Sequence, residues 1–122
     1  MEPVGSFDAI TIDCAEPLEL AGFWAAVFAT EIDSSSGDGP HYVDLRPVPG
    51  VPVLRFQRVR ESKVTKNRLH LDLSVEVLDD ARSRVEALGG RQISGQPITE
   101  YGYTWTVMQD PEGNEFCMSV HA

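Results

Sequence analysis

Two pairs of chemically versatile side chains occur in the second half of the chain, and the members of each pair are two residues apart. His70 and Asp72 lie in the segment RLHLDL, and Glu115 and Cys117 lie in the segment EFCMSV. Because residues two apart on a β-strand point to the same face, each pair is expected to act on one side of a sheet. An imidazole, two carboxylates and a thiol on such a face could bind a metal ion, transfer a proton or hydrogen-bond a ligand.

Structural roles for the same side chains stay open at this point. A strand histidine can be a purely structural, hydrogen-bonded residue, and Asp72 could orient His70, act as a base or stabilise an arginine. Cys117 would be a nucleophile only if a cationic neighbour such as His70 lowered its pKa. The alternative for Cys117 is a buried, unreactive thiol.

The apolar residues predict the elements that position these side chains. Leu71, Leu73 and Val75 alternate with His70 and Asp72, so they are expected to pack under a helix while the polar residues face away from it. A helical apolar period follows and closes at a Gly-Gly pair, after which RQIS, YTWTVMQ and EFCMSV read as strands. The second half therefore has the order β-α-β-β-β.

The first half repeats this order. Residues 7–14 alternate as a strand, Pro17 begins a helix with an apolar stripe, and a second strand starts near Ile32, which aligns with Ile93. HYVDLRP and VPVLRFQRV are typical of two further strands. Ile10 aligns with Leu71 and Ile12 with Leu73 at an offset of 61, which is half of 122 residues. The pattern predicts an α+β fold of two βαβββ modules in a single domain, residues 1–122. Module one covers about 6–58, a link covers 59–67, and module two covers about 68–120.

Composition limits the partners and the compartment. The formal charge of −9 repels phosphate backbones and anionic lipid, so nucleic acid is excluded as a partner. No apolar run is long enough to span a membrane, and the N-terminus does not resemble a secretory signal, so a cytoplasmic protein is expected. Two cysteines without a CxxC pair are expected to be reduced thiols.

The half-length repeat, the segment DPEGNEF before the last strand and the strand histidine together resemble the vicinal oxygen chelate superfamily. Within it, KNRLHLDL with DPEGNEFCM is similar to the glyoxalase-like domain proteins of bacteria. The resemblance implies that the modules form a curled, mixed β-sheet half-barrel with the helices outside and a concave polar face inside. It extends over nearly the whole chain and is specific for the fold, whereas the reaction varies among its members.

Metal-dependent members of that superfamily carry ligands on the first and last strand of each module. The matching positions here are Ala9, Gln57, His70 and Cys117, with Glu115 two residues before the last of them. Ala9 cannot bind a metal and Gln57 is a weak donor. The resemblance therefore leaves His70 and Glu115 as the expected metal ligands, in a rearranged site that Cys117 and Asp72 could complete around a softer metal such as zinc.

Other residues are expected to bind the ligand itself. Arg55 and Gln57 occupy the closing strand of module one, where Arg55 could form an ion pair with Glu115 or hold the charge of a ligand. The aromatics of YGYTW at 101–105, with Tyr103 and Trp105 on one face of a strand, could line an apolar pocket or belong to the core. The Ser/Gly-rich stretch 34–39 is expected to be a loop or a mobile lip over the pocket.

The resulting prediction is a protein that binds a small organic molecule, either without a metal or with an atypical one. In this reading His70, Asp72, Arg55 and Glu115 supply hydrogen bonds and Trp105 stacks on the ligand. The alternative is a metal-dependent lyase or isomerase of glyoxalase type, with His70 and Glu115 as ligands and a neighbouring carboxylate moving a proton. A homodimer is expected, because a curled half-barrel leaves sheet edges and apolar surface open.

Overall fold

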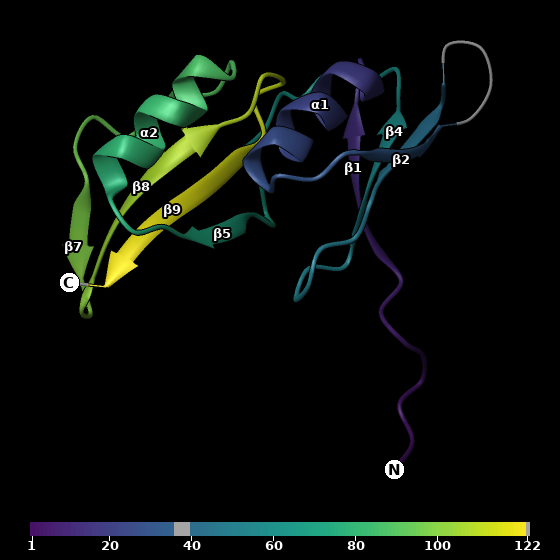
Figure 1. Ribbon diagram of the computed structural model, residues 1–122, viewed down its shortest axis with the longest axis horizontal. Helices are drawn as coiled ribbons and strands as arrows, with labels where there is room; N and C mark the ends of the chain where they lie inside the picture. Colours follow the sequence, from purple (N-terminus) through teal and green to yellow (C-terminus); the bar gives the residue numbers. More distant parts are fainter. Residues whose placement is uncertain (36–39, 122) are drawn as a thin grey trace. The chain divides into compact units, whose positions relative to one another are not determined.

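The computed structural model describes residues 1–35 and 40–121 and divides the chain into two compact units, Met1–Ser62 (unit 1) and Lys63–Ala122 (unit 2). Each unit has a mixed β-sheet with a helix on one face (Figure 1). Residues 36–39, most of the predicted loop or lip at 34–39, lie outside the described residues.

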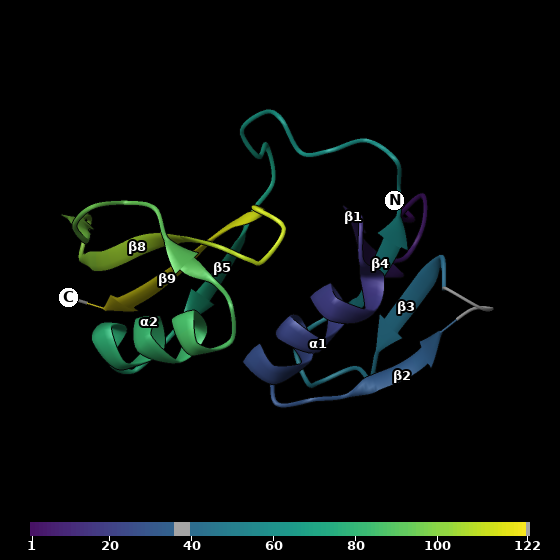
Figure 2. The same cartoon turned by 90° about the horizontal axis from the view of Figure 1, so that it is seen from above.

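Unit 1 contains β1 (Ala9–Cys14), α1 (Pro17–Val27), β2 (Ile32–Ser35), β3 (Tyr42–Leu45) and β4 (Val53–Arg58). Its sheet, here sheet A, has the strand order β1-β4-β3-β2. The pairing of β1 with β4 is parallel and the other two pairings are antiparallel. Figure 2 shows α1 lying along one side of this sheet.

Helix α1 is held by its apolar stripe. Pro17 starts the helix, where its missing N–H costs no hydrogen bond. Leu20, Phe23 and Trp24 are buried, and α1 packs on β3 and β4, whose inward side chains include Phe56. Burial of these large side chains is the main contribution to the stability of unit 1.

Unit 2 repeats the strand–helix–strand order and contains one additional short strand. Its sheet, here sheet B, has the order β5-β9-β8-β6, with β7 also paired to β8. The pairing of β5 with β9 is parallel, and those of β6, β7 and β9 with β8 are antiparallel. The elements are β5 (Leu71–Ser74), α2 (Leu78–Ala87), β6 (Arg91–Gln92), β7 (Ile98–Glu100), β8 (Tyr103–Gln109) and β9 (Glu115–His121).

The central parts of the two long strands of sheet B alternate between a buried and a less buried face. Met108 on β8 and Phe116 and Met118 on β9 are almost fully buried. Trp105 on β8 and Cys117 on β9 are only partly buried and belong to the other face. This second face of sheet B therefore presents the predicted site residues of β8 and β9.

The predicted α+β fold with two modules is confirmed, and the described residues form two mixed sheets without a closed barrel. Two details differ from the prediction. Strand β7 at residues 98–100 was not predicted, because its three residues are all exposed and show no alternation. The alternation predicts a strand from Leu69 to Glu76, whereas β5 covers only Leu71–Ser74, and Leu69 is 88% exposed. Within the described residues, the helices are too short to cross a membrane.

Candidate functional site

A cavity of about 560 Å³ opens on the second face of sheet B, entirely within unit 2. It is bounded by residues from β5, β7, β8 and β9, from the turn between β7 and β8, and from the segment before β5. The lining residues are Lys66, His70, Asp72, Glu100, Tyr101, Tyr103, Trp105, Val107, Glu115, Cys117 and Ser119.

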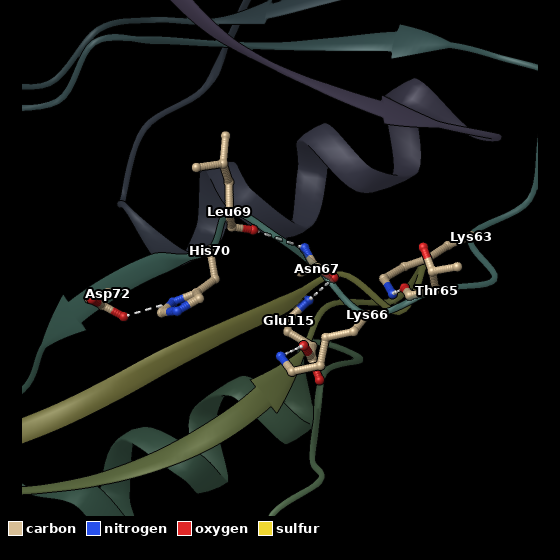
Figure 3. A network of polar contacts seen from close by, with 8 residues as sticks. All are labelled: Lys63, Thr65, Lys66, Asn67, Leu69, His70, Asp72 and Glu115. Carbon is tan, nitrogen blue, oxygen red and sulfur yellow. Dashed lines mark hydrogen bonds and ion pairs between the residues drawn. The ribbon is translucent and has the colours of Figure 1, made fainter.

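His70 and Asp72 interact directly. His70 lies one residue before β5, and its Nδ1 is 3.0 Å from Oδ1 of Asp72 (Figure 3). Both side chains remain accessible, at 43% and 69% of their surface. Because a carboxylate can only accept a hydrogen bond, this contact orients the imidazole and favours the tautomer with its hydrogen on Nδ1.

Cys117 lies opposite Asp72 in the parallel pairing of β5 with β9. One ligand atom from each of His70, Asp72 and Cys117 lies within 4.8 Å of the others. Burial raises the pKa of the Cys117 thiol, and the charges of Asp72 and Glu115 raise it further, against the opposing effect of Lys66. A raised pKa favours the protonated form of Cys117, which is the less reactive form of a cysteine.

Glu115 has a different partner from the one expected. Its carboxylate forms an ion pair with Lys66, and the Glu115 side chain is only 13% exposed (Figure 3). The backbone N–H of Glu115 donates to Oδ1 of Asn67 at 3.2 Å, and Nδ2 of Asn67 donates to the carbonyl oxygen of Leu69 at 3.2 Å. Lys66 and Asn67 lie at the end of the predicted link, residues 59–67. Their contacts with Glu115 attach the segment before His70 to the start of β9.

Aromatic residues form the opposite wall of the cavity. Tyr103 and Trp105 point from β8 into it, as their shared face predicted, and Tyr101 adds a third ring from the preceding turn. The ring of Tyr103 also contacts that of His121 edge-to-face, with centroids 4.7 Å apart. Tyr101 and Gly102 connect β7 to β8 as a two-residue hairpin loop in which both have positive φ, 52° and 80°.

The segment DPEGN shapes the end of this site without lining it. Asp110 is 3% exposed, and its Oδ1 accepts hydrogen bonds from the backbone N–H groups of Glu112 and Asn114 at 2.9 and 3.0 Å. The Asn114 side-chain amide also donates to the same carboxylate. Asp110 thus closes the turn that places Glu115 at the first position of β9.

The predicted site residues of module one lie in unit 1. Arg55 makes a two-pronged ion pair with Asp44 on the neighbouring strand, Nε–Oδ1 2.8 Å and Nη2–Oδ2 3.0 Å, and its Nη1 lies 3.8 Å from Asp8. Asp44 raises the pKa of Arg55 above its usual range. Gln57 is partly buried on the same strand, and its backbone carbonyl oxygen accepts a hydrogen bond from the Cys14 thiol at 3.5 Å. The charge of Arg55 is therefore balanced within sheet A.

The cavity thus brings together six of the eight predicted site residues: His70, Asp72, Tyr103, Trp105, Glu115 and Cys117. Tyr101, from the aromatic segment YGYTW, also lines the cavity. The sequence did not predict Lys66, Glu100, Val107 and Ser119. Val107 and Ser119 could have been found, because they continue the two-residue period of Tyr103–Trp105 and Glu115–Cys117. Nothing in the local pattern indicated Glu100, which comes from the unpredicted strand β7.

The donor atoms near His70 fit a soft divalent metal better than a hard one. Imidazole nitrogen, carboxylate oxygen and thiolate sulfur together are ligands that zinc prefers, whereas manganese and magnesium favour oxygen donors. The metal would have to displace the proton of Cys117, whose pKa is raised. Glu115, a predicted metal ligand, forms an ion pair with Lys66 and is not part of the cluster of His70, Asp72 and Cys117.

Comparison with known proteins identifies the family. A family model described as a glyoxalase-like domain matches residues 9–119. No match was found among curated protein sequences. Among solved structures, the chain is similar to a glyoxalase/bleomycin resistance protein/dioxygenase family enzyme from Burkholderia phytofirmans PsJN, with a TM-score of 0.75 and 19% identity over 94% of this chain and 98% of that one.

Two further structures are similar over almost their whole length. FosX, a fosfomycin resistance protein from Listeria monocytogenes solved with Mn(II) and sulfate, has a TM-score of 0.71 and 15% identity, covering 99% of this chain and 95% of that one. TioX from Micromonospora sp. ML1 has a TM-score of 0.64 and 17% identity, covering 97% and 100%. At these identities the similarity establishes the fold. Because the family model spans most of the sequence, the chain belongs to the glyoxalase-like domain family of the vicinal oxygen chelate superfamily.

Proposed function

We propose that this protein binds a small organic molecule in the unit 2 cavity and that binding needs no metal. The observation that carries this proposal is the cavity itself, about 560 Å³ with an aromatic wall and a few converging polar groups. Small-molecule sites typically have this size and this mixture of apolar surface and placed hydrogen-bonding groups. Trp105 would contact the flat part of the ligand, and His70, Asp72 and Glu115 would bind its polar groups.

The module one positions support a site that works without the family's metal. Ala9 offers no ligand atom, and Gln57 offers only an amide. Arg55 is occupied by Asp44, so its predicted role in ligand binding is a proposal that requires this ion pair to open. The polar groups of unit 2 are sufficient to orient a ligand by hydrogen bonds.

The test is an NMR fragment screen that monitors the signals of the two tryptophans. Trp105 lines the cavity and Trp24 is buried in unit 1, so their indole N–H signals in an NMR spectrum report on different places. Trp105→Phe assigns the signals. Bound aromatic fragments should shift the signal of Trp105 and leave that of Trp24 in place. A library without a binder, or binders that shift only Trp24, would overturn the proposal.

The second candidate is a metal-dependent lyase or isomerase of glyoxalase type, which the cluster of His70, Asp72 and Cys117 favours. These residues would hold the ion. Glu115, which the resemblance to the superfamily gives as a ligand, would be an alternative oxygen donor. A bound divalent metal would polarise a substrate oxygen. A carboxylate beside it, from Asp72 or Glu115, would then accept or return the proton.

Elemental analysis of protein purified without a histidine tag separates the two candidates. The metal-free proposal expects no stoichiometric metal, even after incubation with zinc, nickel or manganese. A stoichiometric metal that His70→Ala removes and the control His41→Ala retains would instead establish the metal-dependent candidate. His41 is a suitable control because it is exposed and belongs to unit 1.

We also propose that the protein acts as a cytoplasmic homodimer. Strands β1 and β5 each end their sheet and have one neighbour within it. Sheet edges of this kind are commonly covered by another chain or element. The two free cysteines, Cys14 and Cys117, support a reducing compartment such as the cytoplasm.

A further inference from the structure

The charges around the unit 2 cavity are unbalanced. Its lining contains three carboxylates, Asp72, Glu100 and Glu115, and one ammonium group, Lys66, so its formal charge is −2 with His70 neutral. Lys66 is already paired with Glu115. Among the described residues, Glu100 takes part in no ion pair, and the recorded partner of Asp72 is His70. Two carboxylates therefore face the cavity without a cation of their own. This excess of carboxylates in the lining disfavours an anionic group on a ligand and favours a cationic one.

The aromatic wall favours a cation for a second reason. Tyr101, Tyr103 and Trp105 line the cavity on the side of β8 and its hairpin, and Tyr101 is 94% exposed. The faces of aromatic rings carry negative potential and attract ammonium and guanidinium groups within about 6 Å, tryptophan most strongly. Glu100 directly precedes Tyr101 in the sequence, so the hairpin presents a carboxylate and an aromatic ring next to each other.

From these observations we infer that the unit 2 cavity selects organic cations: molecules with a flat, apolar body and an amine, ammonium or amidinium group. This inference rests on the proposed function and names its ligand class. The apolar body packs against Trp105, and the cationic group lies between the ring faces and the carboxylates of Asp72 and Glu100. An anionic analogue of the same shape is repelled.

The test compares three probes with one ring system and different charge. These are 1-naphthylmethylammonium, 1-naphthalenemethanol and 1-naphthoate, measured by equilibrium dialysis against chelator-treated full-length protein. The cation should bind at least roughly tenfold more tightly than the anion and roughly threefold more tightly than the alcohol. Added salt should weaken binding of the cation more than binding of the alcohol.

Variants locate the effect. Glu100→Gln should weaken binding of the cation roughly threefold and leave binding of the alcohol unchanged. Trp105→Leu should weaken both probes, with Trp105→Phe intermediate. The control Asp80→Asn removes an exposed charge from α2 of the same unit, away from the cavity, and should change neither.

The outcomes separate this inference from the proposed function. Equal binding of all three probes, weakened for each by Trp105→Leu, would overturn the selectivity for cations and support a small-molecule site. Tighter binding of 1-naphthoate than of the cation would likewise overturn the selectivity for cations and support a small-molecule site. Failure of all three to bind at millimolar concentration would overturn both the selectivity and the proposed site. An equal loss in Glu100→Gln and Asp80→Asn would contradict the assignment to this cavity.

Discussion

Cys117 illustrates how position decides the chemistry of a single residue. It matches a metal-ligand position of the superfamily, and a neighbouring histidine could have made it a nucleophile. The structure instead places it partly buried and opposite Asp72, with Glu115 two residues earlier on the same strand. All three effects raise the pKa of the thiol, which favours its protonated form.

The alkylation of Cys117 should reflect this environment. Only the thiolate reacts with iodoacetamide, so the midpoint of its pH–rate profile should lie above that of an ordinary cysteine, about 8.5. Asp72→Asn removes a negative charge and should lower the midpoint, whereas Lys66→Met removes a positive charge and should raise it. Peptide-resolved mass spectrometry separates Cys117 from Cys14. A midpoint below that of an ordinary cysteine, a higher midpoint in Asp72→Asn or a lower midpoint in Lys66→Met would contradict this explanation.

At the level of elements, the β7–β8 hairpin places a strained residue at the cavity. Tyr101 has a φ of 52°, a conformation that costs a side chain roughly 1 kcal/mol and that asparagine or glycine adopts more easily. Tyrosine at this position places a ring at the cavity. Strained residues that line a cavity are often retained for binding rather than for stability.

Tyr101→Asn should therefore stabilise the protein by about 1 kcal/mol and weaken binding of an aromatic cation. Urea denaturation measures the first effect and equilibrium dialysis the second. Gly102→Ala, at a φ of 80°, should destabilise the same hairpin. Tyr101→Asn protein that is less stable than the wild type, or that binds the cation unchanged, would show that Tyr101 is not kept for the ligand.

The turn that begins at Asp110 is a second element with a clear energetic role. Its buried carboxylate satisfies two backbone N–H groups and the Asn114 amide. Asp110→Ala leaves these donors without an acceptor and should reduce the free energy of unfolding by about 2–4 kcal/mol in urea denaturation. Asp110→Asn keeps one acceptor oxygen and should cost less. The exposed control Asp80→Ala should change stability little, and a similar small loss in Asp110→Ala would contradict the role of this turn.

The sequence predicted those parts of the molecule that follow a regular period. Alternation placed Trp105, Glu115 and Cys117 on one face of sheet B, and the helical stripe of Leu20 and Trp24 marked the core of unit 1. The partner of Arg55 could not be predicted, because Asp44 faces it only through the register of β3 with β4.

Part of the cavity lining comes from segments that have no regular spacing of apolar residues. Lys66 reaches Glu115 from an irregular segment, and Tyr101 enters from a hairpin whose strand β7 has only three exposed residues. Neither contact follows from the spacing of residues along the chain. The site was therefore predictable on its strands and not in its loops, where conformations depend on contacts that are distant in sequence.

At the scale of the whole molecule, dimerisation is the least local of the predictions. Two chains would cover sheet edges that each unit leaves at the end of its sheet. Light scattering coupled to size-exclusion chromatography should give twice the chain mass of 13.5 kDa at micromolar concentration. A mass equal to that of one chain under these conditions would refute the dimer and leave the unit 2 cavity as a monomeric site.

The account rests on the claim that ligand binding is concentrated in the unit 2 cavity. The most direct test is a crystal structure of the protein soaked with an aromatic fragment that shifts the Trp105 signal. The account predicts that the fragment lies against Trp105, with its polar group within hydrogen-bonding distance of His70, Asp72, Glu100 or Glu115. A fragment bound only outside this cavity, or a cavity filled by its own side chains, would contradict it.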